Sequence, residues 1–71
     1  MEQTKREKVA QIIQTARMQK GHTQQDVADM IGCQVQTINK IENAKYSPNA
    51  DILYLLSDIL EIKITLNNIE V

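Results

Sequence analysis

The stretch that most constrains the fold of this chain is residues 23–42, TQQDVADMIGCQVQTINKIE. It opens with Thr23, a residue type that readily caps a helix N-terminus. Two runs of apolar residues at helical spacing follow, and between them stands Gly32, where a sharp turn favours a residue that tolerates positive φ. The stretch therefore predicts two short helices, over 24–31 and 35–43, joined by a tight turn.

Two further helices flank this stretch. Apolar residues at spacings of three and four predict a first helix over 4–20 and a last one over 50–60. Asn49 is the expected cap of the last helix, and Ser47 followed by Pro48 is the alternative. We thus expect one all-α domain, a bundle of four helices with a central helix-turn-helix, followed by a short C-terminal strand or hairpin.

The C-terminal tail, residues 62–71, changes to a period of two. Its apolar positions alternate with polar ones, as in a half-buried strand: Ile62, Ile64 and Leu66. Two interpretations stay open. A two-residue turn at Asn67 and Asn68 would fold the tail into a hairpin that pairs Leu66 with Ile69, whereas a single strand would pair with another chain.

Composition and charge narrow the class of protein. Cys33 is the only cysteine, and no apolar run could span a membrane or serve as a signal peptide, so we expect a soluble, cytoplasmic protein. The net charge of −1 hides a split: residues 1–50 carry seven basic and five acidic residues (+2), and residues 51–71 carry one basic and four acidic (−3). A basic front suits a protein that approaches an anion from one side.

The predicted helix over 35–43 has one polar face. On a helical wheel, Ile38, Ile41 and Glu42 point one way, while Gln36 and Lys40 point the other way. Glutamine can bond adenine N6 and N7 together, and lysine can reach guanine or a phosphate, so this face fits the reading of the DNA major groove. Taken alone, the same pattern also fits an ordinary solvated helix.

The surrounding positions closely resemble the Cro and lambda-repressor-type helix-turn-helix domains, the XRE family, over roughly residues 9–64. The matching positions are Arg17, Thr23, Gln24, Val27, Ala28, Gly32, Ile38, Ile41, Glu42, Pro48, Leu53, Leu56, Leu60 and Ile62. The resemblance implies a lambda-repressor-like bundle in which the second helix crosses the DNA backbone and the third enters the major groove.

The resemblance also implies roles for individual residues. Positions that commonly reach base edges are matched by Val35, Gln36, Thr37 and Lys40, and Gln34 beside them is a further candidate. Positions that commonly contact phosphates are matched by Gln24, Asn43 and Lys45, and Asn39 and Tyr46 are further candidates. Arg17 and Glu42 match an ion pair that sets the pitch of the reading helix, and two unpaired surface charges are the alternative.

Three positions leave alternatives open. Gln34 stands where the family usually has a Ser or Thr cap, so either the third helix begins less tightly or Gln34 itself reaches DNA. Ala44 replaces a common glycine, so the helix exit uses either a left-handed Asn43 or a different turn. The charged run over residues 5–8 is expected to be a solvated first turn, with phosphate contact as the alternative.

The expected function is that of a transcriptional repressor, which binds a palindromic operator as a homodimer. The expected dimer interface combines an apolar stripe of the last helix with the tail: Ile52, Leu55, Ile59, Ile62, Ile64 and Leu66. Strand-ended relatives include antitoxins, so an antitoxin with a toxin protein as partner is the first alternative. A helical domain that mediates only protein contacts is the second, and the amino-terminal domain of a longer protein is the third.

No residue pattern supports catalysis. His22 and Cys33 have no partners at metal-ligand spacing, no nucleophile system is evident, and there is no glycine-rich phosphate loop. We therefore expect no metal, no cofactor, no small-molecule substrate and no membrane partner.

Overall fold

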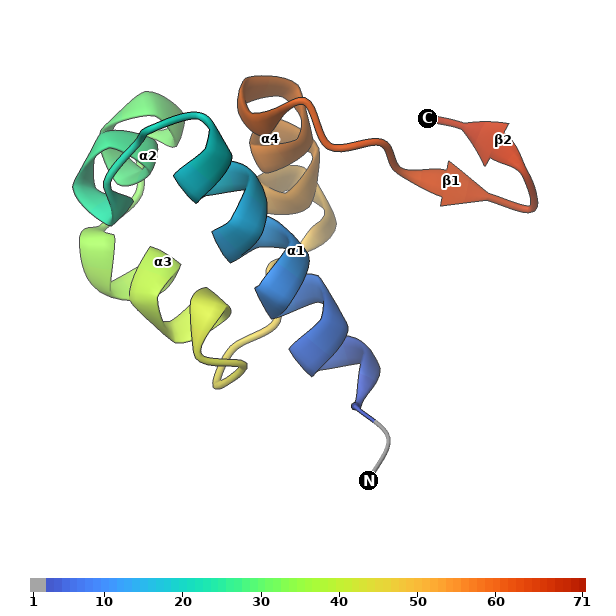
Figure 1. Ribbon diagram of the computed structural model, residues 1–71, viewed down its shortest axis with the longest axis horizontal. Helices are drawn as coiled ribbons and strands as arrows, with labels where there is room; N and C mark the ends of the chain where they lie inside the picture. The colour runs from blue at the N-terminus through green and yellow to red at the C-terminus, as the bar shows by residue number, and fades with distance from the viewer. Residues whose placement is uncertain (1–2) are drawn as a thin grey trace.

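The computed structural model describes residues 3–71 of the chain. It contains four helices, α1 (Lys5–Gln19), α2 (Gln24–Ile31), α3 (Val35–Glu42) and α4 (Ala50–Leu60), and a hairpin of β1 (Thr65–Leu66) and β2 (Ile69–Glu70). The helices pack into a bundle, and the hairpin projects away from it (Figure 1). This arrangement confirms the predicted fold class. None of the helices within residues 3–71 combines the length and apolar character that crossing a membrane requires.

The helices begin where side chains replace missing backbone partners. Thr23 Oγ1 accepts the Asp26 N–H at 3.0 Å, and Asp26 Oδ2 accepts the Thr23 N–H at 2.9 Å, so α2 opens with a capping box. Hydrogen bonding of the Asp26 carboxylate to the Thr23 backbone foremost, and then to the Thr23 side chain, lowers the pKa of Asp26. Thr4 and Glu7 form the same box at α1, and their separation by three positions in the sequence is its signal.

The start of α4 decides between the two expected caps. Asn49 Oδ1 accepts the Ile52 N–H at 2.8 Å, so Asn49 is the cap and Ser47 is not.

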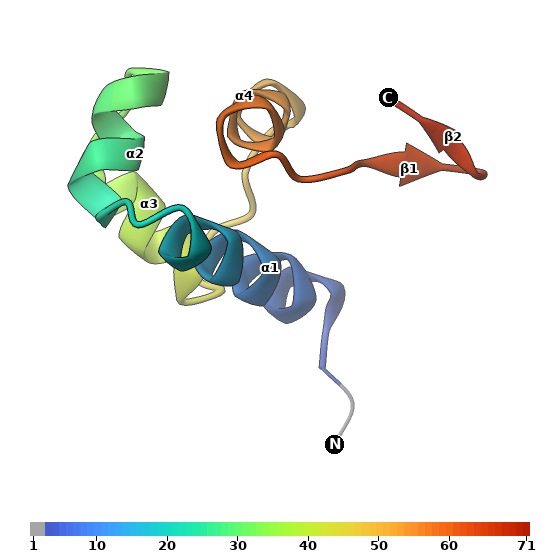
Figure 2. The same cartoon turned by 45° about the horizontal axis from the view of Figure 1, so that its top comes forward.

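The core is aliphatic and is shared by all four helices. Its buried members are Ile13, Val27, Ala28, Ile38, Ile41, Leu56 and Leu60. α1 and α2 each contact both α3 and α4, so α3 is held on two sides (Figure 2). Gly32 makes the α2–α3 turn at φ +76°, and Cys33 after it packs half-buried against the core, where burial raises the pKa of its thiol.

The tail is a hairpin whose strands are shorter and more exposed than expected. Residues 62–64 lie outside the strands. Glu61 ends α4 in the left-handed region (φ +55°), and the Ile62 N–H still bonds to the Ser57 carbonyl of that helix. Asn67 and Asn68 form the turn at φ +51° and +65°, with Leu66 opposite Ile69.

The expectation of a half-buried strand is wrong for the tail. The side chains of Leu66, Ile69 and Val71 are 63–68% exposed, because within residues 3–71 the hairpin makes no extensive contact with a helix. Figure 2 shows the same separation from the bundle.

The exit from α3 uses neither a glycine nor a left-handed Asn43. Asn43 stays at φ −94°, and Ala44 itself adopts φ +59°. The Ala44 N–H bonds to the Ile41 carbonyl at 3.1 Å, and the Lys45 N–H bonds to the Lys40 carbonyl at 2.9 Å. The loop therefore closes around an alanine in a conformation that its Cβ disfavours.

We predict that Ala44→Gly stabilises the domain by about 1 kcal/mol, because glycine adopts positive φ without the Cβ clash. For a domain of this size, that corresponds to a rise in Tm of roughly 4–8 °C in a thermal melt. Ala50→Gly, in the first turn of α4, is the matched control and should lower Tm. An equal fall in Tm for both variants would contradict the strain at Ala44.

Candidate nucleic-acid interface

The third helix presents a polar face to solvent and an apolar face to the core. Ile38 and Ile41 are buried, whereas Gln36, Asn39 and Lys40 are exposed. Lys40 is the only cation on α3. The exposed face is thus a short row of amides with one positive charge, and it can donate and accept hydrogen bonds along its length.

The edges of this face are less open than its centre. Val35 is half-buried against the core and Thr37 is also half-buried, so each offers only part of its side chain to a ligand. The side chain of Gln34 makes no capping bond to α3 and is exposed. Its amide therefore has no capping role at α3 and is available to a ligand.

Two shallow hollows gather most of the predicted contact residues. One lies between α2 and α3 and is lined by Gln24, Val35, Gln36, Asn39 and Lys40. The other continues past Lys40 and is lined by Cys33, Thr37, Lys40, Tyr46 and Ile52. Lys40 borders both hollows, so seven of the ten residues predicted for base edges and for phosphates line adjoining hollows.

An ion pair between α1 and the end of α3 sets the position of this surface. Arg17 Nε and Nη2 donate to Glu42 Oε2 and Oε1 at 2.7 and 3.0 Å, and Nη1 donates to the His22 carbonyl at 2.9 Å. The Glu42 side chain is only 2% exposed and that of Arg17 13%. The hydrogen bond with Glu42 raises the pKa of Arg17. Arg17 thereby joins three parts of the chain: α1 itself, the end of α3, and the segment that precedes α2.

A chain of amides continues from this ion pair to the exposed face. Gln24 Nε2 donates to Glu42 Oε1 at 3.1 Å, and Gln24 Oε1 accepts from Asn39 Nδ2 at 3.3 Å. Asn43 Nδ2 in turn donates to the Asn39 carbonyl and side-chain oxygens at 2.8 and 3.2 Å. Gln24 uses one of its two amide N–H groups on Glu42, so the second N–H is left for an outside acceptor such as an anion.

This amide network was not evident from the sequence, where Gln24, Asn39 and Asn43 each looked like a separate phosphate contact. The spacing of four between Asn39 and Asn43 was the one local signal for part of it. Lys45 and Tyr46 lie outside the network, in the loop after α3, and both are exposed.

The residues predicted for a dimer interface divide into two groups. Ile52, Ile59 and Ile62 are half-buried against the core of their own chain. Leu55 (45%) and Leu66 (63%) are substantially exposed, and Ile64 is half-buried. Part of the expected interface therefore packs within its own chain, and the members that stay substantially exposed are Leu55 and Leu66.

Comparison with known proteins gives one finding. A protein-family model, described as helix-turn-helix, matches residues 13–67, which is most of the chain and includes α2 to α4 and the first strand. A search of curated proteins found no match.

We predict that Arg17→Ala lowers the free energy of unfolding by about 3 kcal/mol, because it leaves the Glu42 carboxylate buried and unpaired. DNA binding should weaken while the preferred sequence stays the same, since Arg17 positions α3 and does not belong to its exposed face. Denaturant titration and binding to sequence variants measure the two effects.

The double variant Arg17→Met with Glu42→Leu is the control, and it should recover much of the lost stability because no charge is left buried. Unaltered melting of Arg17→Ala together with a shifted sequence preference would contradict a positioning role.

Proposed function

The chain belongs to the XRE/Cro-type helix-turn-helix family and is a DNA-binding transcription regulator; from that premise we propose that it is a repressor that binds a palindromic operator as a homodimer. The observation that carries the proposal is the polar face of α3, held at fixed pitch by the bidentate Arg17–Glu42 pair. Repression needs no activity beyond occupancy of the operator, and for that reason we prefer it to activation.

In the proposed complex, α3 enters the major groove and α2 crosses the backbone. Gln36 and Lys40 are the principal base contacts because both are exposed polar side chains at the centre of the face and neither belongs to the amide network. Gln34 and Thr37 contribute at its edges, and Val35 offers a methyl group to a thymine.

Phosphate contacts surround the base contacts in this proposal. Gln24 offers its spare N–H beside the free backbone amides at the start of α2, where the helix dipole also favours an anion. Lys45 and Tyr46 approach the backbone from the loop after α3. Asn39 and Asn43 act mainly through Gln24, because their side chains are engaged in the amide network.

A homodimer is proposed because one reading helix of eight residues offers too few contacts for selective binding. Two copies on half-sites about one helical turn apart, roughly 34 Å, would double them. The exposed apolar surface at Leu55 and the hairpin supports an interface there, since such groups gain from removal from water.

An antitoxin is the second candidate. The observation that favours it is the hairpin, which presents Leu66, Ile69 and Val71 at 63–68% exposure and makes no extensive contact with the helices of residues 3–71. Such a surface equally suits a toxin protein as partner, with DNA binding then serving autoregulation.

We predict that selection from a random DNA pool at physiological salt yields a two-fold symmetric site. Gln36→Ala should weaken binding by about 1–3 kcal/mol through the loss of one base contact in each half-site, and it should relax the base preference at that position. Lys45→Ala should weaken binding equally on all sequences and lower the salt dependence by about one charge per subunit. An unsymmetrical consensus, or one that Gln36→Ala leaves unchanged, would contradict the proposal.

We predict that truncation after Ile64 weakens dimerisation, measured by analytical ultracentrifugation. This end point removes the hairpin but keeps Ile62 on the core. Lys63→Ala, at an exposed position before the strands, is the control and should leave the dimerisation constant unchanged. If truncation also leaves the dimerisation constant unchanged, the hairpin is not part of the dimer interface. Loss of a co-purifying toxin on truncation would favour the antitoxin.

A further inference from the structure

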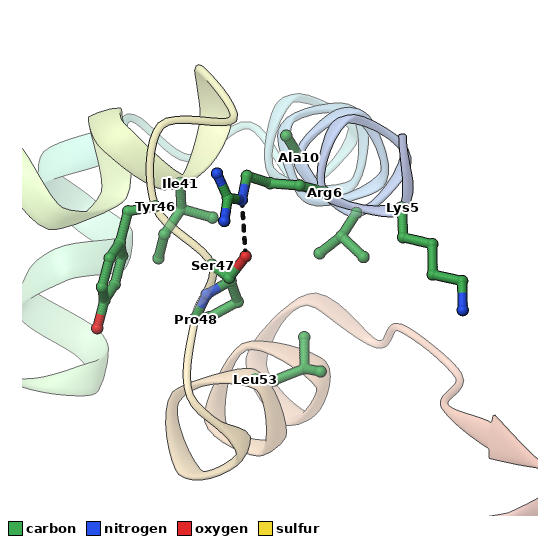
Figure 3. Close-up of a pocket in the computed structure, with 9 residues that line it drawn as sticks. Lys5, Arg6, Ala10, Ile41, Tyr46, Ser47, Pro48 and Leu53 are labelled. Carbon is green, nitrogen blue, oxygen red and sulfur yellow. Dashed lines mark hydrogen bonds between the residues drawn. The ribbon is translucent and has the colours of Figure 1, made fainter. Parts of the chain in front are cut away.

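The first turn of α1 lies against the loop that follows α3. Arg6 Nε donates to Ser47 Oγ at 2.9 Å, a bond between residues 41 positions apart in the sequence. Figure 3 shows the Arg6 guanidinium over this loop, close to Ile41 and Ser47, while Lys5 points away from it. Of the basic residues at the start of α1, Arg6 is thus the one that the fold directs to the loop.

A shallow groove joins this turn of α1 to the proposed phosphate-binding loop. Its lining residues come from both segments: Thr4, Lys5, Arg6, Glu7, Asn43, Ala44 and Ser47. The loop is held in shape by the bonds of the Ala44 and Lys45 amides to the carbonyls of Ile41 and Lys40. Arg6 therefore lines the same groove as Asn43, which stands two residues before Lys45 in the sequence.

The chemistry of Arg6 leaves it able to bind an anion. Only Nε is engaged, and within residues 3–71 its two terminal nitrogens form neither a hydrogen bond nor an ion pair. A guanidinium offers a planar fork that matches phosphate oxygens, and the bond to Ser47 already restricts its freedom.

One acid, Glu7, lines the same groove and would oppose an anion. Its Oε1 accepts the Thr4 N–H at 2.9 Å within the capping box of α1, so this carboxylate is held at the helix start. It does not pair with Arg6.

We propose that Arg6 binds a backbone phosphate of the operator and thereby extends the phosphate-binding surface from the loop after α3 to the first turn of α1. The inference rests on the proposed function. The two phosphate-binding segments come from opposite ends of the first fifty residues, and the Arg6–Ser47 bond joins them into one surface.

The rival role for Arg6 is a tether that only steadies the loop. Ser47→Ala separates the two roles, because it removes the tether and keeps the guanidinium. Lys8→Gln is the matched control, since Lys8 carries the same charge two residues along, roughly 200° around the helix from Arg6.

The experiment measures the affinity of the full chain for its selected operator, and for unrelated DNA, over a series of salt concentrations. Arg6→Gln should weaken binding by the same factor on both DNAs and lower the slope of log K against log[salt] by about 0.9 per subunit. Ser47→Ala and Lys8→Gln should keep the wild-type slope. A thermal melt of each variant checks that the helices stay packed.

Two outcomes overturn the contact. In the first, Arg6→Gln keeps the wild-type slope of log K against log[salt], and Ser47→Ala loses as much affinity as Arg6→Gln. Arg6 would then be a tether only, and the proposed function would stay intact. Absence of salt-dependent binding by the wild type would overturn the proposed function and the contact together.

Discussion

The buried carboxylate of Glu42 is the constraint on which the reading surface depends. A carboxylate at 2% exposure is costly unless it is paired and fully hydrogen-bonded, and here Arg17 and Gln24 supply three donors. Because these donors come from α1 and α2, satisfying one charge also fixes the end of α3 relative to both helices. The electrostatic requirement thereby becomes a geometric one.

This constraint matters because α3 has little stability of its own. Eight residues are too few for an isolated helix in water, and Gln34 supplies no side-chain cap. Burial of Ile38 and Ile41 holds the helix on the core, and the amide network from Gln24 to Asn43 secures its outer edge. The groups that stabilise the helix therefore also orient the residues proposed to meet phosphate.

The small size of the domain shapes its partner surface. With an aliphatic core and few large side chains, the bundle draws Ile52, Ile59 and Ile62 into its own packing. Of the residues predicted for the interface, Leu55 and Leu66 stay substantially exposed, and the hairpin adds Ile69 and Val71. The part of the predicted interface that is open to a second chain is therefore narrower than the apolar pattern of the sequence implies.

The sequence by itself determined the four helices, the turn at Gly32, the inward and outward faces of α3 and the family, because caps, glycines and apolar periodicity act over a few neighbouring residues. Tertiary structure decided the rest. The Arg6–Ser47 bond and the bonds of Gln24 join residues up to 41 positions apart, which no local pattern encodes. The packing of the bundle likewise decided which residues of the α4 stripe are buried. Ala44 at φ +59° has the same origin: packing at both ends of the loop overrides the preference of one residue.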